Sequence, residues 1–337
     1  MKIFITGGLG YLGSALTKEA VKKGHSVVLY DLLIYNQDLN RILKEISPNG
    51  IGVKFIRGDT RDKEFLKKLI KKTNPSFVFH FGELVGYYAC KHDPELTKTI
   101  NFYGTKNVID ICSELNIPLL YNSSSSVYGN QKDGKLMKET DKLPNETELD
   151  VYCKYKLLIE GYIKKKKNIN PKFQVIVFRP ATVGGPSPRM RVDLLPNHFT
   201  YCALAKGKIK VAEQTSCRAI IDIKDVISAY LKVINKKNWE HLIYNVGSHN
   251  LQKIEYAKMI QKVTDCKLIL TENIGDSRNL KIDCSLLENE FSFKPNIKFD
   301  HTINNVKSWM EKNREKIEKS GFIGVINTSL TNWLSML

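Results

Sequence analysis

Several features that define other classes of protein are missing from this chain. None of its apolar stretches approaches the roughly 18 residues of a transmembrane helix, and the first strand-like run begins at Lys2, which leaves no room for a signal peptide. Its seven cysteines form an odd, scattered set without a CxxC pair, so we predict neither a disulfide framework nor a zinc site. We therefore expect a soluble, cytoplasmic protein without a bound metal.

Acidic residues are scarce relative to basic ones. The chain has 35 Asp and Glu against 52 Lys and Arg, a formal net charge of +17, which favours anionic partners. The excess is nearly all Lys and falls on the polar faces of predicted helices, as in residues 63–72 and 164–167, where solvation explains it. No basic stripe with interleaved aromatic residues is present, so a nucleic-acid-binding module is not expected.

The 337 residues, of which 42% are apolar, suffice for a sizeable core and about two domains. Short β-rich runs alternate with segments of helical periodicity up to residue 180. The predicted strands cover residues 2–6, 26–30, 53–56, 76–81, 119–122 and 175–178. The predicted helices between them cover residues 12–23, 38–46, 63–72 and 95–115. This alternation predicts an α/β fold, with a Rossmann-type doubly wound parallel sheet over residues 1–180.

The alternation loosens after Arg179, where glycines and prolines interrupt the chain. Helices are expected over residues 225–234 and 254–263. We predict that residues 181–320 form a smaller C-terminal α/β lobe, with some later segments returning to the first domain. The tail, residues 321–337, is apolar and uncharged. It is expected to pack on the body of the protein or on a partner subunit rather than on a membrane surface.

A glycine-rich turn follows the first predicted strand. Gly7, Gly10 and Gly13 occupy positions 1, 4 and 7 of this turn, where side chains would keep a pyrophosphate from the backbone amides of a helix N-terminus. Asp31 ends the second strand, where its carboxylate can accept hydrogen bonds from a ribose diol and would repel a 2′-phosphate. Because no Arg follows Asp31 directly, the pattern favours NAD over NADP.

Tyr152 and Lys156 are four residues apart in a segment of helical periodicity, so their side chains share one face. An ammonium at that distance can lower the pKa of a phenol toward working pH. Three other Tyr-x-x-x-Lys pairs occur, but only Tyr152 follows the fifth strand at a distance that places its helix beside that strand's carboxyl end. Residues 123–126 are all serine at that end. They are either a substrate-binding segment or a polar turn whose hydroxyls are satisfied.

Together, the TGxxGxxG turn, Asp31, the SSSSVYG segment and the Tyr152/Lys156 pair resemble the extended short-chain dehydrogenase/reductase family. The resemblance is to its NAD-dependent nucleotide-sugar epimerases and dehydratases and covers residues 2–312. It implies a Rossmann domain that holds NAD permanently, a smaller lobe that binds a nucleoside-diphosphate sugar, and a homodimer.

The resemblance also assigns site residues by position in the motifs. It implies that Ser124, Tyr152 and Lys156 are catalytic and that Tyr152 is the general base; Lys156 would also bind the nicotinamide ribose, and Ser124 would contact the substrate. The implied cofactor-binding residues are Gly7, Gly10, Tyr11, Leu12, Gly13, Asp31, Asp59, Thr60, Phe81, Gly82, Asn101, Tyr152 and Lys156. The implied contacts to the sugar nucleotide are Asn197, Arg218 and Arg278. An alternative role for Asp59 is that of a helix N-cap.

This sequence departs from the family pattern near the active site. Ser125 and Ser126 stand where the family's 4,6-dehydratases carry Asp-Glu, so dehydration is not expected. Glu83 stands where a small residue is usual, and Ala219 and Asp222 replace a common Pro and His.

Residues 187–194, with residues 84–86 and Cys90, resemble a branch of surface-polysaccharide sugar enzymes that act on hexoses and heptoses. We predict an epimerase acting at C4 through a transient keto-sugar. A nucleotide-sugar dehydrogenase or a keto-sugar reductase would use the same residues. A non-catalytic NAD sensor is disfavoured because all three catalytic positions are filled.

Overall fold

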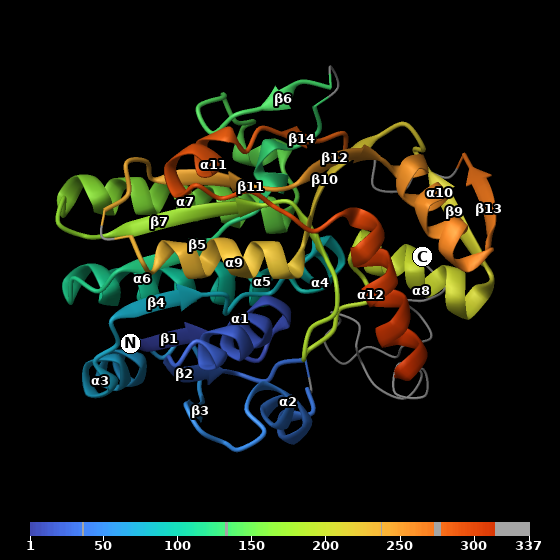
Figure 1. Cartoon of the computed structure of the whole chain (residues 1–337). Helices are drawn as coiled ribbons and strands as arrows, with labels where there is room; N and C mark the ends of the chain where they lie inside the picture. Colours follow the sequence, from blue (N-terminus) through green and yellow to red (C-terminus); the bar gives the residue numbers. More distant parts are fainter. Residues whose placement is uncertain (36, 132–133, 237, 273–277, 314–337) are drawn as a thin grey trace.

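The computed structural model describes residues 1–35, 37–131, 134–236, 238–272 and 278–313. Its centre is a seven-stranded parallel sheet with the order β11-β7-β5-β4-β1-β2-β3 (Figure 1). The bounds are β1 Lys2–Thr6, β2 Ser26–Asp31, β3 Val53–Arg57, β4 Phe77–His80, β5 Leu119–Asn122, β7 Val175–Pro180 and β11 Ile243–Val246. The strand order reverses between β1 and β4, and ligands bind at such a point in open α/β sheets.

Helices cover both faces of this sheet, as the strand–helix alternation predicts. The helices of one face are α1 (Tyr11–Lys22), α2 (Leu39–Ile46) and α9 (Ile223–Val233), and those of the other are α3 (Lys63–Thr73), α6 (Thr105–Glu114) and α7 (Val151–Ile169). Neighbouring strand residues point to opposite faces, so Ile3 and Ile5 pack under α1 while Phe4 packs under α3. The doubly wound fold is confirmed, and the predicted strand and helix positions agree with it.

The helix predicted over residues 95–115 is three consecutive pieces. These are α5 (Pro94–Thr97), a π-helical segment (Lys98–Gly104) and α6. The sequence missed the wider turn because helical periodicity continues through it. A preceding short helix, α4 (Tyr87–His92), borders the same edge of the sheet.

A smaller lobe stands beside the carboxyl ends of the strands (Figure 1). It contains α8 (Leu195–Lys206), the strand pair β9 (Lys208–Ala212) and β13 (Lys267–Thr271), α10 (Lys253–Thr264) and α12 (Phe299–Lys312). Its own core includes Phe199, Ile209, Tyr256, Ile260 and Phe299. β11 belongs to the seven-stranded sheet and α9 packs on that sheet, so the lobe is not one continuous stretch.

Short strands connect the two parts. β8 (Thr182–Gly184), β10 (Cys217–Asp222) and β12 (His249–Gln252) form a three-stranded sheet, and β6 (Leu136–Met137) pairs with β14 (Lys281–Ile282). α11 (Ser285–Phe291) packs near β11. The tail predicted to pack on the body, residues 321–337, lies outside the described residues.

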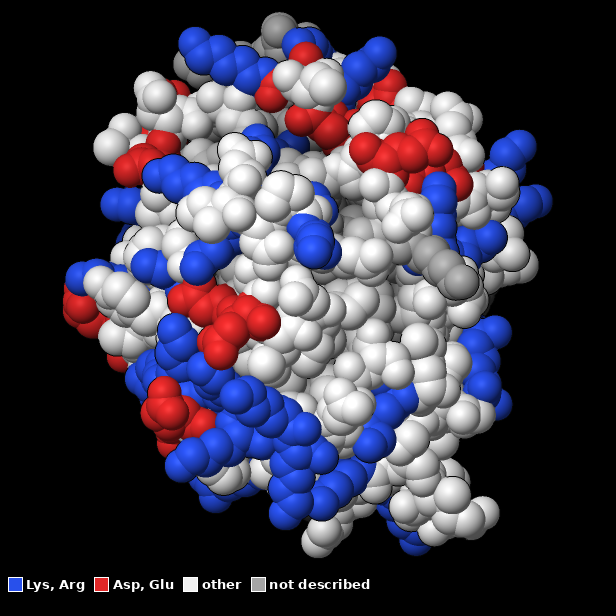
Figure 2. Space-filling model, turned by 90° about the vertical axis from the view of Figure 1, so that its left-hand side faces the viewer, with Lys and Arg blue, Asp and Glu red and all other residues white. Residues whose placement is uncertain are grey.

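Basic side chains crowd one part of the surface, with acidic side chains beside them (Figure 2). Lysines of α3 and α7 form ion pairs with α6: Lys63 and Lys166 with Asp110, at 3.2 and 2.6 Å, and Lys67 with Glu114, at 2.7 Å. These contacts agree with solvated helix faces. Within the described ranges, every helix is too short or too polar to span a membrane.

Candidate active site

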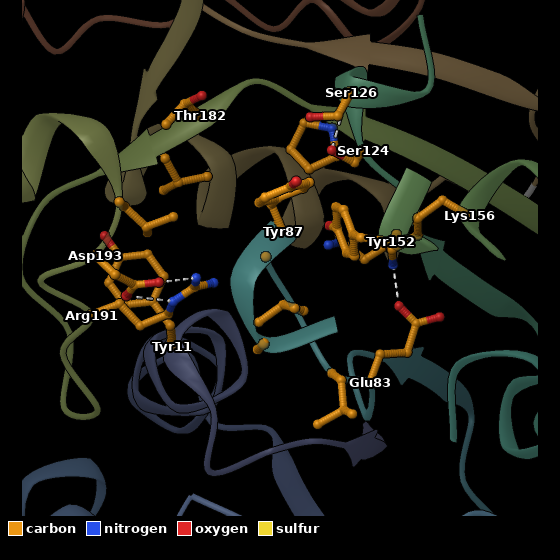
Figure 3. Close-up of a pocket in the computed structure, with 18 of the residues that line it drawn as sticks. Tyr11, Glu83, Tyr87, Ser124, Ser126, Tyr152, Lys156, Thr182, Arg191 and Asp193 are labelled. Carbon is orange, nitrogen blue, oxygen red and sulfur yellow. Dashed lines mark hydrogen bonds and ion pairs between the residues drawn. The ribbon is translucent and has the colours of Figure 1, made fainter. Parts of the chain in front are cut away.

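A cavity of about 1080 Å³ opens at the carboxyl ends of the sheet strands. Its wall is built from the glycine turn after β1, the ends of β2, β4 and β5, the first turns of α7, and strands β8 and β10 beside the smaller lobe. Figure 3 shows side chains from these distant segments facing a common space. The volume and the position at the strand-order reversal are those of a large-ligand site.

The glycine turn presents the N-terminus of α1 to this cavity. Gly10 is the N-cap of the helix, and among the described residues no side chain caps it and no acid lies in its first turn. The first-turn amides therefore remain available to an anion, and the helix dipole adds partial positive charge there. A Cβ on Gly10 would meet only the Gly7 carbonyl oxygen, at 3.1 Å, among described atoms.

The other two glycines are required for a different reason than the sequence suggested. Gly7 has φ +66°, and a Cβ there would lie 2.5 Å from the Phe81 backbone carbon. A Cβ on Gly13 would lie 2.2 Å from the Gly7 carbonyl oxygen. Both clashes are with backbone, which cannot yield as a flexible side chain could. Gly7 and Gly13 thus allow the turn to pack, and Gly10 keeps the cavity side open.

Asp31 is buried and joins the glycine turn to the end of β2. Its Oδ2 accepts from the Leu9 amide at 2.9 Å and its Oδ1 from the Leu33 amide at 2.8 Å. Burial raises the pKa of the carboxyl, while these amides and the nearby Arg189 oppose that shift. Each carboxylate oxygen can accept more than one hydrogen bond, so Asp31 can still bind a ribose diol from the cavity wall.

Other predicted cofactor-binding residues also line the cavity: Leu12, Asp59, Thr60, Phe81 and Gly82. Asp59 is not the N-cap of α3, because Asp62 fills that position and accepts from the Phe65 amide at 3.0 Å. Instead, Asp59 pairs with Arg61 at 2.6 Å, which lowers the pKa of its carboxyl against the effect of burial.

Three residues assigned to ligand contact also have structural partners. Both amide atoms of Asn101 bond the backbone of Leu84, each at 2.8 Å. The Asn197 amide accepts from the Gly185 amide and donates to the Arg191 carbonyl. Neither asparagine lies in the cavity wall; they position the loops that form it. Tyr11 lines the cavity, but its hydroxyl donates to the Gly185 carbonyl at 2.6 Å.

Tyr152 and Ser124 meet in the cavity wall. Asp150 caps α7 by accepting from the Cys153 amide, so α7 begins just before Tyr152. Ser124 accepts from the Ser126 amide at 3.1 Å and hydrogen-bonds the Tyr152 side chain. Burial is the largest cause that raises the pKa of Tyr152, and the Glu83 carboxylate raises it further.

Lys156 is placed differently from the prediction. Its ammonium donates to Glu83 Oε2 and to the Asn122 carbonyl, and Figure 3 shows it directed toward Glu83. It lies 5.7 Å from the centre of the Tyr152 ring. The Glu83 carboxylate compensates this ammonium. A lowering of the phenol pKa by the ammonium together with an oxidised nicotinamide stays a prediction.

Several cationic residues line the cavity wall across from Tyr152 and Ser124. Arg218 and Arg278, for which contact with the sugar nucleotide is predicted, line the cavity, and Arg278 pairs with Asp150 at 3.9 Å. The sequence assigned no roles to Arg189 and Arg191, although it singled out their segment. Arg191 forms an ion pair with Asp193 (Figure 3). Other cavity residues that the sequence missed are Lys91, His198, Lys210 and Lys253.

The structure offers two independent signs of a fit to a dinucleotide. The uncapped α1 terminus beside Asp31 suits a pyrophosphate and a ribose diol. Arg189 lines the same cavity, stacks on Tyr35 at 4.9 Å, and has a buried Nη2 with no hydrogen-bond partner among the described atoms. A buried guanidinium nitrogen costs free energy unless it is paired, so a ligand oxygen at this position would satisfy it.

The parallel sheet, this cradle and the Tyr152–Ser124 pair in the cavity wall are typical of an enzyme of the NAD-dependent Rossmann class. A model of the NAD dependent epimerase/dehydratase family matches residues 3–247, and the chain belongs to that family.

Two named relatives are similar over most of the chain. The ADP-L-glycero-D-manno-heptose-6-epimerase of Brachyspira hyodysenteriae is 27% identical over 95% of this chain and 98% of its own. The UDP-glucose 4-epimerase of Neisseria meningitidis serogroup C is 25% identical over 73% and 77%.

Among solved structures, the UDP-glucose-4-epimerase of Stenotrophomonas maltophila, with bound NAD and formylated UDP-arabinopyranose, is 20% identical. It has a TM-score of 0.83 over 94% of this chain and 99% of its own. This similarity confirms the fold.

Proposed function

We propose that the chain is a nucleotide-sugar epimerase that inverts a sugar carbon, C4, through a transient keto-sugar. The observation that carries this proposal is the Tyr152–Ser124 pair, which faces a cavity that continues from the dinucleotide cradle to a cationic wall. Both relatives are named as epimerases of nucleotide-linked sugars, which supports the reaction class; only the UDP-glucose 4-epimerase supports C4, since the other is named a 6-epimerase. The motif at residues 187–194 supports a role in surface-polysaccharide sugar synthesis.

In this proposal Tyr152 is the proton acceptor and donor. Its phenolate takes the proton from a sugar hydroxyl, and its phenol returns the proton after the other face of the keto-sugar has been presented. Ser124 donates to the oxygen that becomes the carbonyl. Bound NAD would supply the hydride acceptor and donor that the reaction needs. The residues that would hold NAD are the α1 terminus, Asp31 and Arg189.

The cationic wall would bind the nucleoside diphosphate. Arg218 and Arg278 can each present two N–H donors to a phosphate, which suits a diphosphate better than the point charge of Lys does. Arg218 is buried and donates to the Cys217 carbonyl at 3.0 Å, so its position is defined by β10. We also propose a homodimer, which a measurement of the mass in solution tests.

Dehydration is not proposed for this site. It would need an acid beside the active-site hydroxyl to protonate the departing oxygen, and residues 125 and 126 are serines. Ser125 is buried, and Ser126 lines the cavity.

The test uses the purified chain with its cofactor and a panel of UDP-, ADP-, GDP- and dTDP-sugars, followed by chromatography and mass spectrometry. We expect a new isomer of unchanged mass. Loss of two hydrogens would instead identify a dehydrogenase, and loss of water a dehydratase. On the substrate found, Tyr152→Phe should lose at least a hundredfold of kcat, since general acid–base catalysis contributes about 10²–10⁴. A loss below tenfold would reject Tyr152 as the acid–base.

A further inference from the structure

Arg189 lies on the connecting segment, residues 185–194, which joins β8 to α8 and passes beside α1 (Figure 1). Its amide donates to the Ser14 hydroxyl at 3.2 Å, and Ser187 donates to the Tyr11 carbonyl at 2.7 Å. Tyr11 and Ser14 belong to the first turn of α1, whose N-terminus borders the cavity. The backbone of Arg189 is therefore fixed against the helix terminus that we propose binds the coenzyme.

Tyr35 holds the side chain of Arg189 in the cavity wall. The guanidinium stacks on the Tyr35 ring, with its central carbon 4.9 Å from the ring centre. Tyr35 follows β2, and its hydroxyl accepts from the Val85 amide, beyond β4, at 3.3 Å. Because β1 lies between β2 and β4 in the sheet, the Tyr35 side chain spans the carboxyl end of β1, where the glycine turn begins. Stacking occupies the face of a guanidinium and leaves the N–H donors at its edge available to a ligand.

The protein does not satisfy all of these donors. Arg189 is 5% exposed, and its Nη2 has no hydrogen-bond partner among the described atoms. Of the carboxylates around it, Asp31 accepts from two backbone amides and Asp193 is paired with Arg191. A buried cationic donor costs free energy unless it is bonded. An anionic oxygen bound at Nη2 would remove that cost.

Two anionic groups are expected in the cavity, the pyrophosphate of the coenzyme and the diphosphate of the sugar nucleotide. Arg189 lies beside Ser14 and Asp31, on the side proposed for the coenzyme. The arginines proposed for the sugar nucleotide come from other elements, Arg218 from β10 and Arg278 from the segment before β14. A planar guanidinium matches the paired oxygens of a phosphate. The position of Arg189 therefore favours the pyrophosphate of the coenzyme.

We propose that Arg189 binds the pyrophosphate of the dinucleotide, so that the connecting segment completes the site that the glycine turn begins. The inference rests on the proposed function, in which NAD is bound, and assigns a phosphate contact to a residue outside the glycine motif. Coenzyme affinity then depends on two parts of the chain that lie 175 positions apart, at Ser14 and Arg189.

The test compares dissociation constants, measured by calorimetry, of the wild type and Arg189→Met, as full chains freed of bound coenzyme. Methionine keeps an apolar side chain against Tyr35 and removes the donors. NAD and ADP-ribose share the pyrophosphate, and both should bind the variant about tenfold or more weakly, the order expected for one charge-assisted hydrogen bond. Adenosine, measured by displacement of ADP-ribose, and UDP should each change by less than about twofold, because a removed charge acts weakly at a distance in salt.

Arg41→Met is the matched control. Arg41, on α2, donates to the Pro188 carbonyl at 2.9 Å, so it contacts the same connecting segment, but it lies outside the cavity wall formed by the described residues. The substitution removes the same charge, and its NAD dissociation constant should stay within about twofold of the wild type. An equal loss of affinity in Arg41→Met and Arg189→Met would show that net charge or the placement of the segment causes the loss, and would overturn the inference.

Thermal unfolding separates a binding role from a structural one. Without coenzyme, Arg189→Met should have a Tm no lower than that of the wild type, because it removes a buried donor that lacks a partner. Saturating NAD should raise its Tm less than it raises that of the wild type. A variant with a lower Tm and an unchanged NAD dissociation constant would make Arg189 structural and overturn the inference. If Arg189→Met does not fold, Arg189→Gln provides the same comparisons with a polar side chain.

The results distinguish failure of this inference from failure of the proposed function. If the wild type binds neither NAD nor ADP-ribose, the proposed function fails. If it binds both and Arg189→Met binds them equally tightly, only the role of Arg189 fails. A loss for adenosine as large as that for ADP-ribose, or a loss confined to UDP, would place Arg189 on the adenosine or on the sugar nucleotide and would also overturn the inference.

Discussion

Replacing Arg179 with Met should destabilise the protein strongly, because it leaves a buried carboxylate without its cation. Arg179, on β7, and Glu160, on α7, are each 1% exposed and joined by two hydrogen bonds, at 2.5 and 3.0 Å. Ser123 donates to the same carboxylate at 2.6 Å, and Arg179 donates to the Tyr128 hydroxyl at 2.9 Å. This network lies behind the serine segment that carries Ser124.

The magnitude follows from the burial of both ions. Removal of one partner of a buried ion pair costs about 3–5 kcal/mol, since the remaining charge is neither solvated nor paired. Replacement of both ions by apolar residues of similar size is often neutral or stabilising. We therefore expect Arg179→Met to lose about 3–5 kcal/mol and the double variant Arg179→Met/Glu160→Leu to recover at least half of that loss.

Urea unfolding of the wild type, both single variants and the double variant gives the four free energies of a double-mutant cycle. The measurement is made at pH 7 with NAD at one fixed concentration, because a ligand that binds the folded state adds to stability. A single-variant loss below about 1 kcal/mol, or a double variant less stable than Arg179→Met, would refute the reasoning.

Two further predictions concern the glycine turn and His80. Gly13→Ala should destabilise the fold by at least about 2 kcal/mol, because its Cβ would lie 2.2 Å from the Gly7 carbonyl oxygen. Gly10→Ala should leave thermal unfolding nearly unchanged but weaken NAD binding, which calorimetry measures. Equal Tm losses in the two variants would contradict this assignment. Because burial lowers the pKa of His80 to about 3, the unfolded chain gains a proton below about pH 6.5 that the folded chain does not bind. The stability present above pH 6.5 is lost as pH falls toward 3, by about 2 kcal/mol at pH 5. His80→Gln should lose less stability than the wild type between pH 7 and pH 5 in urea titrations, and an equal loss would show that His80 does not supply the difference.

The strands and most helices could be predicted because local pattern determines them. The buried strand at 175–178 and the glycine turn before α1 can each be recognised from a short run of consecutive residues. The π-helical segment at 98–104 could not be predicted, since a wider turn leaves the apolar spacing almost unaltered.

The ligand-binding side chains were predicted unevenly for a similar reason. The position of a residue in a motif predicts the helix, strand or loop that carries it, but not the hydrogen-bond partners of its polar atoms. Asn101 and Asn197 stand at the expected positions, and both bond backbone instead of lining the cavity. The ion-pair partner of Lys156 could not be predicted from the sequence, because Glu83 lies 73 positions away. The unusual acid at that position was nevertheless a visible signal.

The hydrogen bond from Tyr11 to Gly185 has a mechanical consequence. Ser187 also donates to the Tyr11 carbonyl, at 2.7 Å, and contacts the Ser14 hydroxyl at 3.1 Å. Buried hydrogen bonds therefore join the first turn of α1 to the segment that leads into the smaller lobe. An outward movement of the smaller lobe would have to break these hydrogen bonds, so we expect it to disturb the first-turn amides that we propose bind the pyrophosphate.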